Sequence, residues 1–261
     1  MDFRKKIILG RTGLLAGRLG LAASYGAPTE AFEEAFEKGC NYFYWGSFRK
    51  DTMCRAIKNI CAKGKRDDLI IVVQSYSRSP YLMEVFYKKA LKSLGLDHAD
   101  ILLLGCHNKR PAQKLINKAI QMKEKGYYRF LGMSGHNRLL FPQVAKEGIF
   151  DLFHVRYNAV HRGAEKEIFV PLQYDSRPGI VSYTATSWGQ LLNIKNMPPD
   201  STIPPASDCY RFVLSNSSVD VCMCGPRDLS QMREALKTLE LGPLNNEEME
   251  RIKKIGDYIH K

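Results

Sequence analysis

Histidines and tyrosines that could transfer protons follow directly after several short apolar runs of this 261-residue chain. Imidazole and phenol groups are common general acids and bases, and imidazole titrates closest to neutral pH. If the apolar runs are parallel strands, their carboxyl ends meet at one edge, where enzymes of barrel architecture build their sites. The polar and aromatic residues at these positions are Tyr44, Trp45, Tyr76, His107, Asn108, His136, His154, Arg156, Tyr157, Asn158 and His161.

Several of these residues also have an ordinary structural explanation. Tyr44 and Trp45 either line a site or fill space in the core, and His107 is either a site residue or a loop residue. We predict no metal site, because no carboxylate and no His-x-His spacing accompanies the histidines. Cys222 and Cys224 place two thiols on one face of a predicted strand, an arrangement that could hold a soft metal. We favour the alternative that they pack as small hydrophobic residues on a buried strand.

The elements that must position these residues alternate regularly along the chain. Continuous apolar runs predict strands covered on both faces, and the longer amphipathic segments between them predict helices. Eight such pairs predict a single α/β domain over residues 1–261, a (β/α)₈ TIM barrel with an extra C-terminal helix. The predicted strands are 18–23, 40–44, 69–73, 100–104, 130–133, 151–155, 179–183 and 219–223; the predicted helices are 29–38, 51–62, 80–94, 111–125, 139–147, 164–172, 207–214, 229–239 and 246–260.

Composition narrows the class of protein. Hydrophobic residues at 44% and charged residues at 25% are typical of soluble globular chains. No apolar run is long enough for a membrane span or a signal-peptide core, and seven scattered cysteines suit a reducing compartment, so we expect a cytoplasmic protein. The net charge of +12 is spread without interleaved aromatics, which predicts no nucleic-acid binding. That charge reflects either a solvated surface or attraction for a phosphorylated ligand or acidic partner.

Ordered motifs along nearly the whole chain resemble those of the aldo-keto reductases. Residues 39–46, G-C-N-Y-F-Y-W-G, resemble the family's G-x-N-x-F-D-T-A, and residues 131–136, L-G-M-S-G-H, resemble I-G-V-S-N-H. The resemblance implies a barrel that reduces carbonyl compounds with hydride from NADPH. Further matching segments are 9–14, 18–22, 151–158, 179–183 and 225–234.

The family's Asp-Tyr-Lys-His catalytic tetrad is missing from the matching positions. Tyr44 stands for the Asp, Gln74 for the Lys and Gly105 for the His, while the Tyr position falls on Arg49 by direct count in a shorter loop. In the family, a buried Lys⁺ held by Asp⁻ favours phenolate and so lets the Tyr donate its proton. Losing Asp and Lys together leaves neutral groups that ordinary hydrogen bonds can satisfy.

Replacement proton donors are predicted from strand geometry. Residues i and i+2 of a strand share a face, so Tyr76 and His107 lie one layer nearer the mouth than Gln74 and Gly105. If the protein is an enzyme, we predict His107 or Tyr76 as the acid-base group, with Tyr44 and His136 as supporting donors.

The motifs imply a better preserved cofactor site. Arginine suits the adenosine 2′-phosphate because its planar fork pairs with phosphate oxygens. Gly135 and Ala235 replace two asparagines that are usual in the family, so a flavin or another phosphate-bearing ligand is an alternative occupant. The residues implied to bind NADP(H) are Ser134, His154, Tyr183, Arg227 and Gln231.

The sequence therefore predicts an aldo-keto-reductase-like oxidoreductase that uses NADP(H) on a small-molecule substrate, with non-standard or lost catalytic machinery. The alternative is a non-catalytic barrel that binds a ligand or a partner, a pseudoenzyme. Neither the substrate nor the oligomeric state is specified by these patterns.

Overall fold

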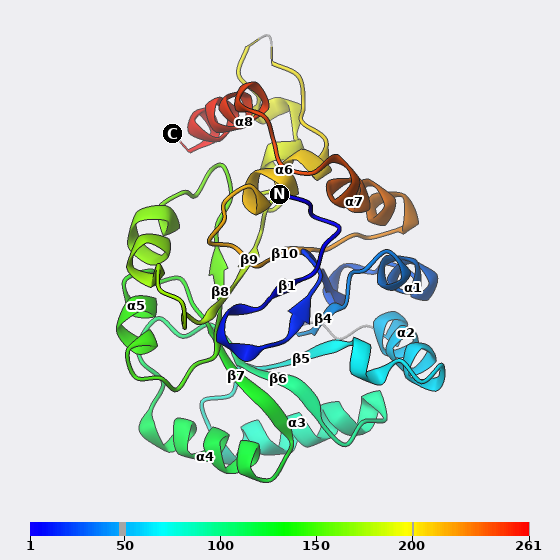
Figure 1. Ribbon diagram of the computed structural model, residues 1–261, viewed down its shortest axis with the longest axis vertical. Coiled ribbons are helices and arrows are strands. Elements are labelled where there is room, and N and C mark those ends of the chain that lie inside the picture. Colours follow the sequence, from blue (N-terminus) through cyan, green and yellow to red (C-terminus); the bar gives the residue numbers. More distant parts are fainter. Residues whose placement is uncertain (47–50, 200, 261) are drawn as a thin grey trace.

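The computed structural model describes residues 1–46, 51–199 and 201–260. Eight parallel strands close into a barrel in which each strand pairs with the next along the chain and the last returns to the first (Figure 1). The predicted (β/α)₈ fold is confirmed. The barrel strands are β3 (Leu19–Ala22), β4 (Tyr42–Trp45), β5 (Ile70–Ser75), β6 (Ala99–Leu104), β7 (Tyr128–Ser134), β8 (Leu152–Arg156), β9 (Gly179–Tyr183) and β10 (Val221–Cys224).

Helices surround the barrel, and α3, α7 and α8 begin at residues whose side chains cap them. The side chain of Asp228 accepts a hydrogen bond from the Gln231 N–H and so begins α7. Ser79 caps α3 in the same way, and Gly95 ends it in the left-handed conformation. The helices are α1 (Thr29–Glu37), α2 (Asp51–Ala62), α3 (Pro80–Leu94), α4 (Gln113–Glu124), α5 (Leu140–Ala145), α6 (Ala206–Leu214), α7 (Leu229–Leu241) and the extra C-terminal α8 (Asn246–Ile259).

Two local predictions were wrong. Threonine is a favoured N-cap, so the sequence predicts that Thr29 caps α1. Thr29 is instead the first residue of the helix, and Pro28 takes the capping position without a side-chain hydrogen bond. The predicted helix 164–172 is a π-helix, Glu165–Phe169, followed by a 3₁₀ turn, Val170–Leu172. Pro171 explains the second difference, because proline lacks the N–H that an α-helix needs and its ring clashes with the preceding turn.

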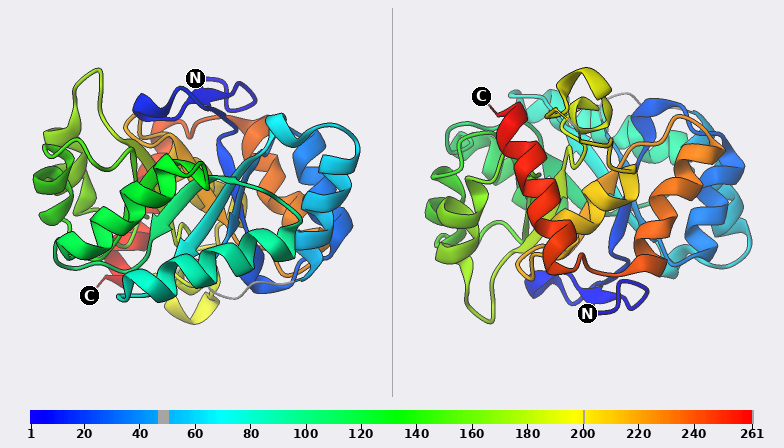
Figure 2. Two further views of the ribbon diagram at one scale, coloured as in Figure 1. Left: turned by 90° about the horizontal axis from the view of Figure 1, so that it is seen from below. Right: turned by 90° about the horizontal axis from the view of Figure 1, so that it is seen from above.

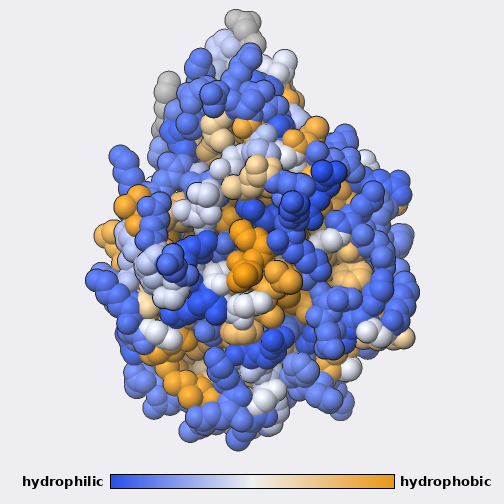
Figure 3. Space-filling model, in the orientation of Figure 1, coloured by the Kyte–Doolittle hydropathy of each residue, from blue (hydrophilic) through white to orange (hydrophobic). Residues whose placement is uncertain are grey.

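A short hairpin that the sequence pattern does not predict closes the amino-terminal end of the barrel. Strands β1 (Ile7–Ile8) and β2 (Leu15–Ala16) pair antiparallel, and Leu9 and Ala16 are fully buried against residues of the barrel interior. Figure 2 shows the hairpin at one end of the barrel and the segment after β9 at the other. The hairpin leaves Ile8 and Leu15 exposed. Figure 3 shows a small hydrophobic area near the centre of this face.

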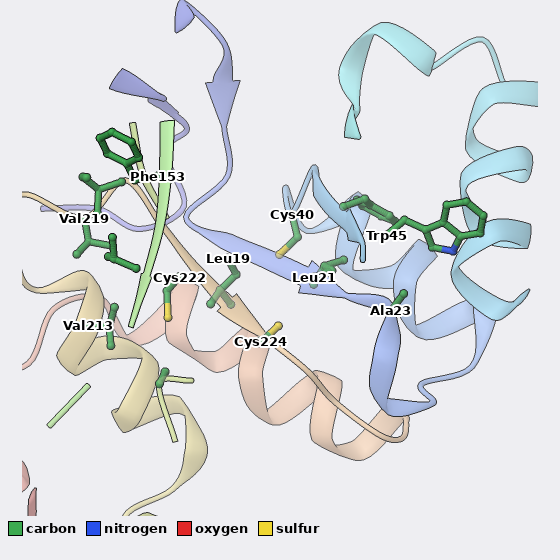
Figure 4. Packing of buried hydrophobic residues seen from close by; sticks show 14 of the residues in the cluster. Leu19, Leu21, Ala23, Cys40, Trp45, Phe153, Val213, Val219, Cys222 and Cys224 are labelled. Carbon is green, nitrogen blue, oxygen red and sulfur yellow. The ribbon is translucent and has the colours of Figure 1, made fainter. Parts of the chain in front are cut away.

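The barrel strands separate two hydrophobic cores. One lies inside the barrel and includes Val72 and Val181, and the larger one lies between the strands and the helices. Cys222 and Cys224 are buried in the larger core, alongside Val213 of α6 (Figure 4). In the described residues, none of the helices combines the length and apolarity that a membrane crossing requires.

Candidate functional site

A cavity of about 830 Å³ opens at the carboxyl-terminal end of the barrel and extends to the start of α7. Its position matches the end of the fold where barrel enzymes place their sites. The cavity brings together all of the predicted site residues except His107: Tyr44, Tyr76, Ser134, His136, His154, Tyr183, Arg227 and Gln231.

Two of the positions that the resemblance matches to the tetrad, Tyr44 and Gln74, line this cavity, and Gly105 lies against Gln74. A Cβ atom added to Gly105 would lie 2.2 Å from Nε2 of Gln74 and 2.8 Å from Cδ1 of Tyr76. The volume that a histidine side chain would need at position 105 is therefore occupied by Gln74 and Tyr76. Arg49, the direct-count position of the catalytic tyrosine, lies outside the described residues.

A second tyrosine, which the sequence analysis did not select, holds His154 in place. The Tyr42 hydroxyl lies 2.7 Å from Nε2 of His154, and both side chains are buried. Burial lowers the pKa of His154 to about 3, so its ring is neutral at physiological pH. The ring of Tyr44 lies 5.6 Å from that of His154 and folds over Gly46, where a Cβ would be 2.0 Å from Cζ of the tyrosine.

The turn after β6 is attached to the end of β7 through Ser134. The Ser134 hydroxyl accepts a hydrogen bond from the Cys106 N–H at 3.0 Å, and the Ser134 carbonyl accepts one from the His107 N–H at 2.7 Å. The Ser134 O–H can still donate to a ligand, since a hydroxyl both donates and accepts. A Cβ on Gly135 would lie 2.0 Å from the His107 carbonyl oxygen, which explains the glycine in place of the family's asparagine.

His107 and Tyr76, the two predicted acid-base groups, occupy different environments. The His107 side chain is 5% exposed, and its Nε2 is buried without a hydrogen-bond partner among the described residues. Burial, and then the nearby charge of Arg78, lower the pKa of His107 to about 4. Tyr76 is half exposed and lines the cavity, so of the two groups it is the one placed to meet a ligand.

His136 and Tyr183 form a contact at the mouth. The Tyr183 hydroxyl donates to the Gly135 carbonyl at 3.2 Å and lies 3.4 Å from Nδ1 of His136, with the two rings edge to face. Burial raises the pKa of Tyr183 to about 12. Burial, and then the charge of Arg156, lower the pKa of His136, so a neutral imidazole faces a neutral phenol.

At the other end of the cavity, Arg227 and Gln231 lie at the amino terminus of α7. The Gln231 side chain accepts a hydrogen bond from the Arg227 N–H at 3.1 Å. Among the described residues, the Arg227 guanidinium has no carboxylate within salt-bridge distance. Glu234, the acid that lines this end, is paired with Lys237 at 2.7 Å and accepts a bond from Ser207 at 2.7 Å. A free cation beside a helix amino terminus is suited to bind an anion.

Comparison with known proteins agrees with this architecture. Aldo-keto reductase AKR11C1 from Bacillus halodurans, in its holo form, superimposes with a TM-score of 0.79 at 20% identity over 96% of each chain. Its apo form gives a TM-score of 0.78 at 21% identity over 96% of this chain and 95% of that one. The chain has the aldo-keto reductase fold. No protein-family model matches the sequence, and a search of curated proteins gives no significant match.

Within the aldo-keto reductase fold, this chain strains its backbone around the cavity. Cys106, Thr184 and Trp188 line the cavity with φ angles of 58°, 61° and 56°, and neighbouring Ser187 has a φ of 49°. Each such conformation costs about 1 to 3 kcal/mol for a residue other than glycine, and such strain is concentrated at functional sites. No pattern in the sequence predicts these angles. In the described part of the chain, no three metal-ligating side chains come together.

Proposed function

We propose that this protein is an aldo-keto-reductase-like oxidoreductase that binds NADP(H) and acts on a small-molecule carbonyl substrate without the family's tetrad. The observation that carries the proposal is the continuity of one cavity. It joins the free cation of Arg227 to Ser134 and Tyr183, the residues that the family resemblance assigns to the nicotinamide.

The residues present fit such a cofactor. The Arg227 fork and the amino terminus of α7 would hold the 2′-phosphate, because both offer donors to phosphate oxygens. The Ser134 O–H would donate to the carboxamide, and the Tyr183 ring would stack on the nicotinamide. When bound, the cofactor supplies the hydride.

Tyr76 is the proposed proton donor, with His136 as its supporting group. Both side chains line the cavity and lie on the mouth side of the floor that Gln74 and Tyr44 fill. The reacting carbonyl must therefore lie within hydrogen-bond reach of Tyr76, higher in the barrel than in enzymes with the tetrad. His107 remains a predicted alternative, although its side chain does not line the cavity.

Fluorescence titration tests cofactor binding. We expect Arg227→Ala to weaken NADPH by about tenfold or more and to leave NADH within about twofold, because only NADPH carries the 2′-phosphate. Arg233→Ala is the matched control, since Arg233 lies on the same helix and pairs with Glu34 at 3.0 Å on the surface. Absence of saturable NADPH binding at millimolar concentration would refute the proposal.

A non-catalytic barrel is the second candidate, and one observation favours it. Gln74 fills the volume beside Gly105 that a catalytic histidine would occupy, so the family's reaction chamber is partly closed. Turnover that depends on Tyr76 would exclude this candidate. A protein that binds NADPH but shows no turnover with any carbonyl compound in a broad panel would support it.

A further inference from the structure

Arg156 places a positive charge at the mouth of the barrel. Along β8, Leu152 belongs to the interior core and His154 lines the cavity, whereas Phe153 and Val155 belong to the outer core. Since alternate residues of a strand share a face, Arg156, the last residue of β8, is on the same side of the strand as Leu152 and His154. It is not among the residues that line the cavity, and it lies at the rim, paired in register with Tyr183, which does line it.

The neighbours of Arg156 are hydrogen-bonding groups of the cavity wall. Arg156 and Tyr183 are directly paired in the register of β8 and β9. The Tyr183 hydroxyl lies 3.4 Å from Nδ1 of His136, and the His136 ring is exposed to the cavity. The charge of Arg156 lowers the pKa values of both His136 and His161, after the larger effect of burial, which places the guanidinium near both rings.

The described part of the chain gives Arg156 neither a hydrogen-bond acceptor nor a carboxylate partner. The acids of the neighbouring segments are already engaged. Glu167 pairs with Arg138 at 2.7 Å, Asp257 pairs with Arg162, and Glu165 accepts from the Tyr157 hydroxyl at 2.7 Å. A partly buried guanidinium without an internal anion is a site where an external anion gains a charge-assisted, two-pronged hydrogen bond.

We propose that Arg156 and His136 form an anion-binding subsite at the cavity mouth, and that the substrate is a carbonyl compound bearing a carboxylate or phosphate group. The substrate assignment rests on the proposed function, whereas the anion subsite can be tested without it. The subsite is distinct from the phosphate position proposed at Arg227, because Arg156 lies on β8 and Arg227 follows β10. An anion bound at Arg156 favours the protonated form of His136, in which both ring nitrogens donate, and so gives a second donor beside the guanidinium. Tyr76 lies within the same cavity for the proton transfer.

Calorimetric titration of the full-length protein without cofactor tests the subsite, with succinate, inorganic phosphate and the uncharged analogue succinamide as probes. We expect succinate or phosphate to bind at least about tenfold more tightly than succinamide, and Arg156→Gln to remove this preference. Tighter binding of succinate would identify a carboxylate subsite, and tighter binding of phosphate a phosphate subsite. Arg156→Lys should retain part of the preference, since it keeps the charge but loses the fork.

Lys109→Gln is the matched control, because Lys109 is an exposed cation after β6 at the same end of the barrel. It should leave both affinities within about twofold of the unchanged protein, as expected for a screened surface charge. Equal binding of succinamide, absence of anion binding at millimolar concentration, or full anion affinity in Arg156→Gln would each overturn the subsite. NADPH titration of Arg156→Gln separates the two proposals. Unchanged NADPH affinity is expected, and a loss as large as that of Arg227→Ala would assign Arg156 to the cofactor instead.

Discussion

The two ends of the cavity differ in how closely they follow the aldo-keto reductase pattern. At the α7 end, Arg227 and Gln231 keep the residue types that the family uses for a phosphate, on a helix that Asp228 caps. At the floor, the neutral residues Tyr44 and Gln74 stand at the positions that the resemblance matches to the family's charged Asp and Lys. The resemblance therefore predicts that binding residues are retained at one end of the cavity and that proton-transfer residues are exchanged at the other.

This difference indicates that phosphate binding and proton transfer place different demands on the barrel. An isolated buried charge is costly, so the Asp and Lys of a tetrad must be lost or kept together. At the floor, the 2.7 Å contact between Tyr42 and His154 satisfies one pair of buried neutral groups. The α7 end carries no such constraint, because its cation is free of internal partners among the described residues.

Placing one charged residue on the cavity floor should have the largest effect, a loss of stability. We expect Gln74→Lys to lower the free energy of unfolding by about 4 kcal/mol, because a buried ammonium would lack its carboxylate. Tyr44→Asp combined with it should recover part of that loss. Gln231→Lys makes the same exchange at the exposed α7 end and should change stability by no more than about 0.5 kcal/mol. Equal urea midpoints for Gln74→Lys and Gln231→Lys would remove the distinction between the two ends.

Lowering the pH should also destabilise the protein, through protonation of His154 at the floor. The folded pKa of His154 is about 3, below its unfolded value, so the unfolded chain binds the proton first as the pH falls. Stability contributed by neutral His154 is present above about pH 6.5 and is lost toward the folded pKa, by about 3 kcal/mol between pH 7 and pH 4. His154→Gln should flatten this decline in urea unfolding curves. Parallel pH profiles for the two proteins would contradict the assignment.

The smallest expected effect concerns the proposed proton donor. We expect Tyr76→Phe to lower kcat by about 100-fold, the lower range for removal of a general acid, with NADPH affinity unchanged. The measurement is NADPH oxidation with succinic semialdehyde and with uncharged butanal. Tyr81→Phe, at a tyrosine that is 72% exposed on α3, should leave kcat unaltered. Full turnover in Tyr76→Phe would move the acid-base role elsewhere in the cavity.

The fold was predictable because each barrel strand is buried on both faces and therefore reads as a continuous apolar run. Strand Gly179–Tyr183 has the predicted bounds for this reason. Helix Pro80–Leu94 has the predicted bounds because Pro80 suits the first position of a helix and Gly95 suits the residue after its end. The hairpin of Ile7–Ile8 and Leu15–Ala16 was not predictable, since two-residue strands are too short to show a periodicity.

The site was predictable only as far as strand geometry extends. The alternation of side chains along a strand places Tyr76 on the same face as Gln74, and Tyr76 does line the cavity, one residue past the end of β5. The same alternation does not place His107 there, because β6 ends at Leu104 and Cys106 then takes a left-handed conformation, with a φ of 58°, that breaks the pattern. The Tyr42–His154 contact joins β4 to β8, which are not neighbours in the barrel, and such a pairing leaves no local trace in the sequence.

The amino-terminal hairpin has a consequence for the order in which ligands move. Leu9 and Ala16 seal the barrel beneath the interior core, so molecules enter and leave the cavity through its carboxyl-terminal opening. Where two molecules enter through one opening, the molecule bound deeper must bind first and dissociate last. For a nicotinamide bound beside Ser134 and a substrate bound above it at Arg156, that geometry predicts an ordered sequential mechanism, in which the cofactor binds first and dissociates last.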